Sequence, residues 1–364
     1  MLTAGDDYPL HQRSEPIAFA GTDRNFYDRY FFQGQSPDGR LVFAAALGVY
    51  PHLDILDAAF SVLAEGVQRS VFASRILRHE RMATHVGPIA VEVRLPLREL
   101  AVRVAETDGI GAELVMTGLH PPIEEPRFLR RLGARTLMDV TRMTQNVRWS
   151  GHVTLDGRTV DIEGFRGTRD RSWGVRPIGA ADPQPLAPGS VPQFFWLWAP
   201  LVFEGLSLFA HTNDDAEGEP WNRSAVLVDH ATGRETRLRD PSFALALAPG
   251  TRRAAACTLA ARLPDGTALE ARLVPEPPFL MSGLGYGHPT RGHGLFQGEL
   301  SVATERVEVA TIDPAIPLHA HVQAPVAAEL RREGQPPLAG RGVLEQLVIG
   351  PHRPSGLAEL FDLA

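Results

Sequence analysis

The sequence predicts an all-β protein with few, short helices. Four Asp-Gly pairs stand between apolar or alternating segments, and this pair suits the positive φ angles of tight hairpin turns. The chain also holds 34 glycines and 30 prolines, a share above the average for soluble proteins, and no long segment repeats its apolar residues with the helical period. Apolar residues make up 44% of the chain, enough for a sizeable core. The four pairs are Asp38-Gly39, Asp108-Gly109, Asp156-Gly157 and Asp265-Gly266.

Each Asp-Gly turn predicts the strands on either side of it. The expected hairpins join residues 25–32 to 41–50, 97–105 to 112–117, 147–155 to 159–165, and 257–263 to 268–273. Thr232-Gly233 predicts a further turn of the same kind. Two segments could instead form short helices: residues 124–137, which have apolar side chains on one side, and residues 355–363, which have Ser355 as a candidate N-cap.

A proline-rich segment predicts a boundary between two domains. Residues 177–192 contain five prolines among small residues without any periodicity, which is typical of an ordered connector. The connector separates residues 1–176 from residues 193–364, and both parts contain several expected strands. Their size and turn spacing fit two β-barrels or sandwiches in tandem.

Composition excludes several classes of function. All 36 basic residues are arginine, so neither a Schiff-base lysine nor a Walker A lysine is available. The formal net charge of −7 and the lack of a dense basic run argue against nucleic acid as a partner. Cys257 is the only cysteine, so an internal disulfide and a four-cysteine zinc site are impossible. There is also no nucleophile elbow and no dinucleotide-binding glycine fingerprint.

The sequence also predicts a soluble, cytoplasmic protein without stable membrane insertion. Residues 1–16 carry three acidic groups and no apolar run, unlike a signal peptide. The longest apolar stretch, residues 191–210, is interrupted by prolines, a glutamine and a glutamate, so it does not resemble a membrane-spanning helix.

The densest group of chemically active side chains lies in residues 167–177, Gly-Thr-Arg-Asp-Arg-Ser-Trp-Gly-Val-Arg-Pro. In a strand, Asp170 faces one side, and Arg169, Arg171 and Trp173 face the other. One interpretation makes Asp170 a general acid whose pKa is raised inside an apolar cavity. The structural interpretation pairs Arg169 and Arg171 with carboxylates, lets Asp170 cap a turn, and lets Trp173 close the end of a barrel.

An aromatic row and a late glutamate are further candidates. Phe194, Trp196 and Trp198 alternate with Phe195 and Leu197. Such a row could line a ligand cavity and stabilise a carbocation by cation–π attraction, or it could be ordinary core. Glu345 lies in a late strand flanked by glycines, and it is either a buried partner of an arginine or a second catalytic carboxylate.

Residues 285–294 contain four glycines together with Tyr286, His288 and His293. This composition suggests a tight functional loop at a cavity mouth. A metal site would need further ligands from His211, His319 or His321, but the spacing matches no zinc motif. We therefore expect neither a metal nor an organic cofactor.

The Arg169–Trp173 segment resembles the two-domain lipocalin-like proteins that include carotenoid 1,2-hydratase, AttH-like and tocopherol-cyclase-like proteins. Residues 25–30, 36–39, 141–145, 285–294 and 342–345 add to the likeness, in a branch that has Arg-Asp-Arg-Ser-Trp-Gly. The resemblance implies two lipocalin-like, calycin-type antiparallel β-barrels in tandem. In the hydratases a pattern like Tyr-His-Asp-His-x-Trp-Gly carries an acid on which the reaction depends, and Asp170, Trp173 and Gly174 match that pattern. Thr168, Arg169 and Arg171 replace its tyrosine and histidines.

Two functions follow as hypotheses. The first is a cofactor-independent enzyme that hydrates, isomerises or cyclises an apolar isoprenoid, polyketide or steroid-like substrate, with Asp170 as the acid and with His211 or His288 orienting water. The second is a non-catalytic protein that binds a lipid or another hydrophobic small molecule in a barrel cavity. In either case the expected substrate contacts are Trp173, Phe195, Trp196, Trp198, Tyr286, His293 and Glu345.

Overall fold

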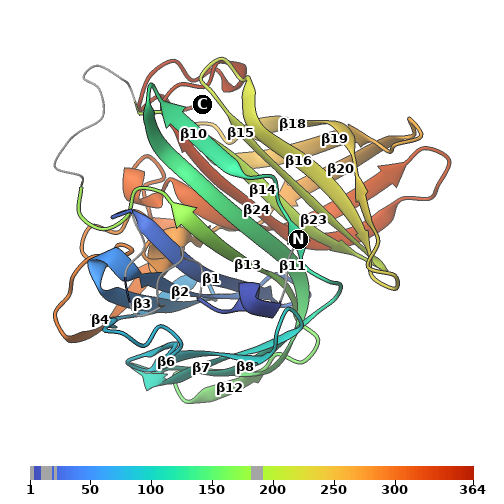
Figure 1. The fold of residues 1–364 in the computed structure, drawn as a ribbon. Coiled ribbons are helices and arrows are strands. Elements are labelled where there is room, and N and C mark those ends of the chain that lie inside the picture. Colours follow the sequence, from blue (N-terminus) through green and yellow to red (C-terminus); the bar gives the residue numbers. More distant parts are fainter. Residues whose placement is uncertain (1–3, 10–18, 20–22, 182–191) are drawn as a thin grey trace. The chain divides into compact units, whose positions relative to one another are not determined.

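The computed structural model describes residues 4–9, 19, 23–181 and 192–364, and nearly all of their regular structure is antiparallel strand (Figure 1). The predicted all-β fold is therefore confirmed. Helices within these residues are single 3₁₀ turns, and no helix there is long and apolar enough to cross a membrane. The turns are η1 (Ala4–Asp7), η2 (Pro51–Leu53), η3 (Met281–Leu284), η4 (Val309–Thr311), η5 (Pro317–His319) and η6 (Arg353–Ser355).

The chain divides into two compact units. The first unit is Met1–Pro183 with Ser282–Glu308, and the second unit is Gln184–Met281 with Val309–Ala364. The sequence led us to expect all of residues 193–364 in one domain, but Ser282–Glu308 groups with the first unit instead. Most of the expected connector, residues 182–191, lies outside the described residues.

The first unit is built on one antiparallel sheet that forms a nearly closed barrel. Its order is β22-β4-β3-β2-β1-β13-β11-β8-β7-β6-β5, and β9, β10 and β12 also pair with β11. The strands are β1 (Phe26–Gln35), β2 (Leu41–Tyr50), β3 (Ile55–Ala64), β4 (Val67–Ile76), β5 (His85–Val86), β6 (Ile89–Leu95), β7 (Glu99–Thr107), β8 (Ile110–Gly118), β9 (Ile123–Glu124), β10 (Phe128–Leu132), β11 (Arg135–Leu155), β12 (Arg158–Asp161), β13 (Arg166–Val175) and β22 (Leu300–Glu308).

The second unit is built on a second nearly closed antiparallel sheet. Its order is β17-β16-β15-β14-β24-β23-β20-β19-β18, with β21 also paired to β23. The strands are β14 (Phe194–Phe203), β15 (Leu206–Asp214), β16 (Pro220–Asp229), β17 (Glu235–Arg237), β18 (Arg239–Leu247), β19 (Ala254–Arg262), β20 (Ala268–Pro275), β21 (Phe279–Leu280), β23 (His321–Arg332) and β24 (Leu338–Ile349).

The hairpins expected at the Asp-Gly pairs are confirmed. They join β1 to β2, β7 to β8, β11 to β12, and β19 to β20. Both residues of Asp108-Gly109 and of Asp156-Gly157 have positive φ, between 49° and 76°. Two such residues in succession match the mirror-image turn that suits the twist of a hairpin. The turn at Thr232-Gly233 also forms, between β16 and β17.

The two expected helices are not present. Residues 128–132 form β10, which pairs with the start of β11 through a turn at Gly133, where φ is 58°. Only local propensity favoured a helix there, and the pairing of β10 with the long β11 overrides it. In place of the second helix, the 3₁₀ turn η6 ends at Ser355, and the left-handed φ of 73° at the following Gly356 stops helical propagation.

Alternating side chains fill the inside of each barrel. In the first unit, Phe43, Leu47 and Phe60 point inward from β2 and β3 and share one buried cluster with Trp149 of β11, whose ring lies 5.1 Å from that of Phe43. In the second unit, Phe195, Leu197 and their alternate neighbours on β14 form the corresponding cluster. Each cluster lies within one unit, so the two sheets have separate cores. The side chains between these inward positions lie on the outer face of each sheet.

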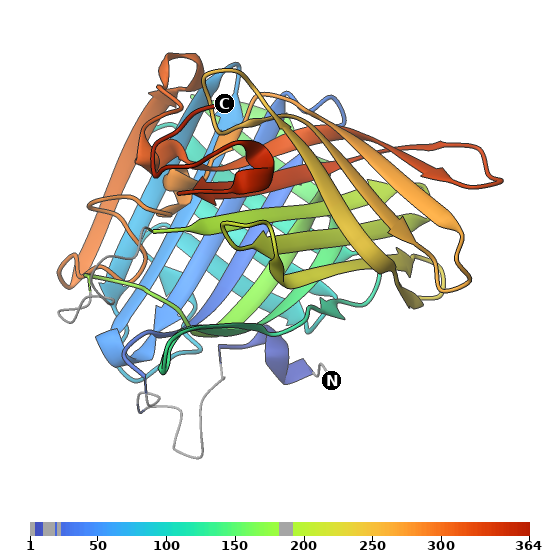
Figure 2. The same cartoon turned by 90° about the horizontal axis from the view of Figure 1, so that it is seen from above.

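Ser282–Glu308 joins the first unit through β22, which pairs with β4 along nine residues, from Leu300 opposite Arg75 to Glu308 opposite Val67. Figure 2 shows β22 (orange) as the edge strand beside β4 (blue). The glycine-rich loop of residues 285–294 is thereby held against the outer face of β1–β4.

Candidate functional site

Strand β13 carries Arg169 and Arg171 on its inner face, inside the barrel of the first unit. Both side chains are at most 1% exposed, and each pairs with a carboxylate as the structural interpretation expected. Arg169 pairs with Asp7, and Arg171 lies 2.5 Å from Asp28. The Arg171 guanidinium also stacks 4.1 Å from the ring centre of Tyr30. These arginines are therefore neutralised within the barrel.

Asp170 lies on the outer face of the same strand. Its Oδ2 accepts a hydrogen bond from Arg142 Nη2 at 2.9 Å, and Arg142 also lies 3.8 Å from Glu125. A cation this close favours the charged form of a carboxyl group. Asp170 therefore pairs with an arginine from β11, and neither Arg169 nor Arg171 supplies that charge.

At the end of this segment, the close approach of two backbones requires a glycine at position 174. Its φ is 137°, and a Cβ built there would lie 2.1 Å from the carbonyl oxygen of Asp139 on β11. Only glycine fits this close approach of two backbones. Trp173, the preceding residue, is partly buried opposite Asp28 and Thr141.

The glycine-rich loop brings His293 and Tyr286 onto Arg29 of β1. The Arg29 guanidinium lies 2.6 Å from His293 Nδ1 and 4.6 Å from the Tyr286 ring centre. His293 Nε2 donates to the Leu284 carbonyl at 2.9 Å, so Nδ1 is the acceptor for Arg29 and the imidazole is neutral. His288 lies apart from this group, with its ring 5.4 Å from Phe72 and its Nε2 3.7 Å from Glu305.

Arg29 is the centre of an electrostatic cluster on this outer face. Burial lowers the pKa of Arg29, but Tyr286, Tyr50, Asp57 and Asp170 outweigh burial and hold the pKa above its usual value. The carboxyl groups of Asp57 and Asp170 therefore act on the same Arg29 guanidinium as Tyr286 of the glycine-rich loop. Sequence reasoning found Asp170 and Tyr286 but missed Arg29 and Asp57.

Asp57 is a carboxyl group with a raised pKa on the same outer face. Burial raises its pKa from 3.8 to about 6, although Arg29, the Gly294 N–H, Tyr50 and Arg176 act in the opposite direction. Its Oδ1 accepts from Tyr50 at 3.0 Å and its Oδ2 from the Gly294 N–H at 2.7 Å. An acid within the apolar stretch of residues 55–63 was the sequence signal that could have found it.

A small cavity opens beside Asp57. Its volume is about 20 Å³, room for a water molecule but not for an organic substrate. The polar groups in its lining can hold such a water. They are Asp57, Ser74, Arg291, His293, Gln297 and Ser301.

In the second unit, the outer face of the sheet carries a buried glutamate with three hydrogen-bond donors. Glu345 of β24 is 7% exposed. Its Oε1 accepts from Trp196 Nε1 at 2.9 Å and lies 2.8 Å from His321 Nε2, and its Oε2 accepts from Gln323 Nε2 at 2.5 Å. An indole, an imidazole and an amide therefore hold this carboxylate. In the sequence, His321 was predicted only as a possible metal ligand.

His211 and Trp198 share this outer face with Glu345. Trp198 is opposite both His211 on β15 and Glu345 on β24. The His211 ring lies 5.6 Å from that of Trp196, and its Nε2 lies 3.3 Å from Asn222 Oδ1. We call Trp196, Trp198, His211, His321, Gln323 and Glu345 the Glu345 cluster.

Phe195 points to the opposite side of β14, into the core of the second unit. It stacks on His352 with ring centres 3.8 Å apart. The structure thus brings Trp196, Trp198, His211 and Glu345 together and separates Phe195 from them. The remaining predicted residues, Asp170, Trp173, Tyr286, His288 and His293, belong to the first unit.

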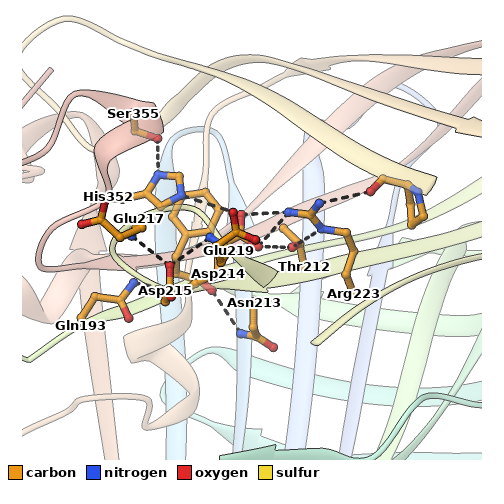
Figure 3. A network of polar contacts seen from close by, with 12 residues as sticks. Gln193, Thr212, Asn213, Asp214, Asp215, Glu217, Glu219, Arg223, His352 and Ser355 are labelled. Atoms are coloured by element: carbon orange, nitrogen blue, oxygen red, sulfur yellow. Dashed lines mark hydrogen bonds and ion pairs between the residues drawn. The ribbon is translucent and has the colours of Figure 1, made fainter. Parts of the chain in front are cut away.

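A second polar network in the second unit surrounds Asp214 (Figure 3). Arg223 Nη2 lies 3.0 and 3.2 Å from the two carboxylate oxygens, and Thr212 donates to Oδ1. Burial raises the pKa of Asp214, but hydrogen bonds from His352, Thr212 and Arg223 outweigh burial and lower it overall. A fully paired carboxylate of this kind fits a structural role. No group of three or more His, Cys, Asp or Glu side chains among the described residues has a metal-binding arrangement.

Solved structures with a similar fold cover almost the whole chain. An AttH-like protein from Nitrosomonas europaea has a TM-score of 0.54 and 16% identity over 93% of this chain and 98% of its own. Kievitone hydratase from Nectria haematococca has a TM-score of 0.54 and 10% identity, covering 92% and 91%. CghA has a TM-score of 0.51 and 11% identity, covering 94% and 95%. The resemblance to the lipocalin-like hydratase and cyclase group, with its tandem barrels, is confirmed for the fold.

Sequence comparison is less specific about function. A search of the curated proteins finds no match. A family model described as a family of unknown function, DUF8625, matches residues 2–358. Because this match spans nearly the whole sequence, the chain belongs to the DUF8625 family.

Proposed function

We propose that the protein is an enzyme that transfers a proton to or from an apolar small molecule, and that His321 and Glu345 carry this step. The observation behind the proposal is the buried Glu345 carboxylate with its three donors from Trp196, His321 and Gln323. A carboxylate bound to an imidazole is the arrangement that orients a catalytic histidine.

The geometry assigns a role to each ring nitrogen of His321. When Nε2 donates to Glu345, Nδ1 of the neutral ring is the basic nitrogen. Nδ1 can then accept a substrate proton, and the nearby carboxylate stabilises the imidazolium that results. His321 and Glu345 are less than 10% exposed, and exclusion of water strengthens this electrostatic stabilisation.

The aromatic side chains of the cluster favour an apolar substrate. The indole faces of Trp196 and Trp198 suit an isoprenoid, polyketide or steroid-like molecule, and they attract a developing carbocation. Once Nδ1 of His321 carries a proton, the imidazolium can give that proton to a double bond. In hydration, water then adds to the carbocation and returns a proton to Nδ1. In isomerisation a different carbon loses its proton to Nδ1, and in cyclisation a second double bond attacks the cation before that proton is lost. None of these steps requires a cofactor. One neighbour of the same fold is named a hydratase, which supports this reaction class.

The resemblance to the hydratases assigns the acid to Asp170 instead. Measuring proton transfer in variants of Glu345 and of Asp170 distinguishes the two assignments. Apolar compounds that co-purify with the protein are identified by mass spectrometry and incubated with it in D₂O. Deuterium uptake into a product should fall by at least about 10²-fold in Glu345→Gln, the low end of a general acid–base contribution. The matched control is Glu329→Gln, which removes a half-exposed carboxylate on the neighbouring β23.

Two outcomes contradict this assignment. Equal deuterium uptake in the wild type and in Glu345→Gln, together with a loss in Asp170→Asn, moves the chemistry to Asp170. Binding of the compound without any deuterium uptake in the wild type shows that the protein is a non-catalytic binder of hydrophobic small molecules.

A further inference from the structure

The inside of the first barrel contains two arginines, and only one of them pairs with a carboxylate from the sheet itself. Arg171 pairs with Asp28, and these two residues lie on the adjacent strands β13 and β1. Arg169 instead pairs with Asp7, which belongs to the short turn η1 and not to the sheet. Asp7 is 0% exposed and Arg169 is 1% exposed, so neither charge is screened by water.

The contacts of Asp7 are those of a bound carboxylate. One oxygen pairs with Arg169 Nη1, and the other accepts the backbone N–H of Leu97. Arg169 is held in place by Gln145, whose Oε1 accepts from Arg169 Nε at 2.8 Å. A guanidinium combined with a backbone N–H is a common recognition site for carboxylate groups.

The rest of η1 is attached to the barrel through backbone atoms. Tyr30 donates its hydroxyl hydrogen to the Asp7 carbonyl, and Arg171 donates to the carbonyls of Asp6 and Tyr8. Figure 1 shows η1 (dark blue) at the open end of the first barrel, between β1–β4 and β6–β8. Residues 4–8 therefore occupy the barrel end as a ligand would, with Asp7 as the charged group.

We propose that Arg169, oriented by Gln145, and the Leu97 N–H form a carboxylate-binding site that the chain fills with its own Asp7, and that a small free carboxylate can take this place. A buried guanidinium left without its anion is strongly destabilising, so the site attracts any carboxylate that fits. The ligand must be compact, because the core around Phe32 and Trp149 fills the barrel beyond the site. Formate and acetate have the size of the Asp7 carboxyl group. The proposal concerns the first unit and does not depend on the proposed function of the second.

The test removes Asp7 and offers a free anion. Asp7→Ala should melt about 10 °C below the wild type, because one partner of a buried ion pair is lost. About 100 mM sodium formate should restore at least about 3 °C relative to sodium chloride at the same concentration, since a ligand specific to the native state stabilises it by mass action. Formate should shift the wild type no more than chloride does, because Asp7 occupies the site.

Two further variants provide the controls. Asp7→Ala combined with Arg169→Met should lose the response to formate, because the guanidinium is absent. Asp156→Ala breaks the exposed pair with Arg69 and should show no formate-specific shift. Should Asp7→Ala fail to fold in chloride, it is refolded in formate, and recovery of the strand signal in circular dichroism supports the site. Equal melting or equal refolding yield in formate and chloride overturns the proposal.

Discussion

The Asp170 carboxylate and the Arg142 guanidinium lie 2.9 Å apart on the outer face of the first sheet. They come from the adjacent strands β13 and β11, where Asp170 is opposite Thr144 and Arg142 is opposite Ser172. The two side chains are therefore diagonal neighbours on one face, and each is 11% exposed. The Asp170 side chain accepts a hydrogen bond from this guanidinium, so its first expected role is structural.

Asp170→Asn should lower the melting temperature and leave turnover per folded molecule nearly unchanged. The amide keeps the size of the side chain but removes the nearer of two carboxylates beside Arg142, since Glu125 lies 3.8 Å away, and this loss costs up to about 3 kcal/mol for a buried pair. Thermal unfolding followed by circular dichroism and turnover normalised to folded protein measure the two effects separately.

Arg142→Gln completes a double-mutant cycle for the same pair. The double variant should be less destabilised than the sum of the two single variants, since each single substitution already removes the interaction between Arg142 and Asp170 and the double variant loses it only once. A fall in turnover of about 10²-fold or more in Asp170→Asn, with its melting temperature unchanged, would instead establish the acid that the resemblance assigns.

Cys257 should be unreactive in the folded protein. It is 1% exposed in the core of the second unit, and burial raises the pKa of its thiol to about 12. The reactive thiolate is therefore scarce as well as inaccessible. Labelling with a chromogenic disulfide reagent at neutral pH should be negligible without denaturant and stoichiometric after unfolding. Rapid stoichiometric labelling of the native protein contradicts this prediction.

Local chemistry explains what could be predicted of the fold. Asp-Gly turns depend on two adjacent residues, so the hairpins at Asp108-Gly109 and Asp156-Gly157 are visible in the sequence. The pairing of β22 with β4 depends on residues far apart in the chain, and no local pattern marks it. The same reason explains the error at residues 124–137, where pairing with β11 overrides a weak helical pattern.

For the candidate sites, the direction of the side chains could be predicted from the sequence, but their partners could not. Alternation along a strand correctly predicted that the side chains of Asp170 and Arg169 point to opposite faces of the sheet. It also predicted that Trp196 and Trp198 share one face. The partners of these side chains could not be predicted, because the sequence of one strand does not determine which residues of the next strand lie opposite it. Asp170 meets Arg142, and Glu345 meets His321, only once the sheet is assembled.

Asp214→Asn should destabilise the protein at neutral pH and have little effect in acid. The folded-state pKa of Asp214 is below its usual value of 3.8 because hydrogen bonds from His352, Thr212 and Arg223 outweigh burial. The stability from this carboxylate is therefore present above pH 3.8 and is lost as the pH falls through the lower folded-state pKa. Melting temperatures of the wild type and the variant should converge with acidification. Curves that stay parallel over the whole pH range contradict this expectation.

Asp57 should produce the opposite dependence on pH. Burial raises its pKa from 3.8 in the unfolded chain to about 6 in the folded protein, so the folded state binds the proton more tightly. The stabilising contribution is then fully present below pH 3.8 and is lost as the pH rises through about 6. Arg29, Tyr50, Arg176 and the Gly294 N–H all favour the carboxylate, and burial outweighs them.

Asp57→Asn removes this titration, because its amide is neutral at every pH. Between about pH 4.5 and pH 7 the wild type should lose roughly 2 kcal/mol relative to the variant, the linkage expected for a carboxyl group titrating near pH 6. The comparison uses the slope of stability against pH, since Asn also changes the hydrogen bonds to Tyr50 and Gly294 at all pH values. Asp38→Asn is the matched control: Asp38 is exposed, and a hydrogen bond from Ser36 lowers its pKa, so it titrates below this window. A wild-type slope that survives in Asp57→Asn would show that Asp57 titrates at its ordinary pKa and that another group produces the slope.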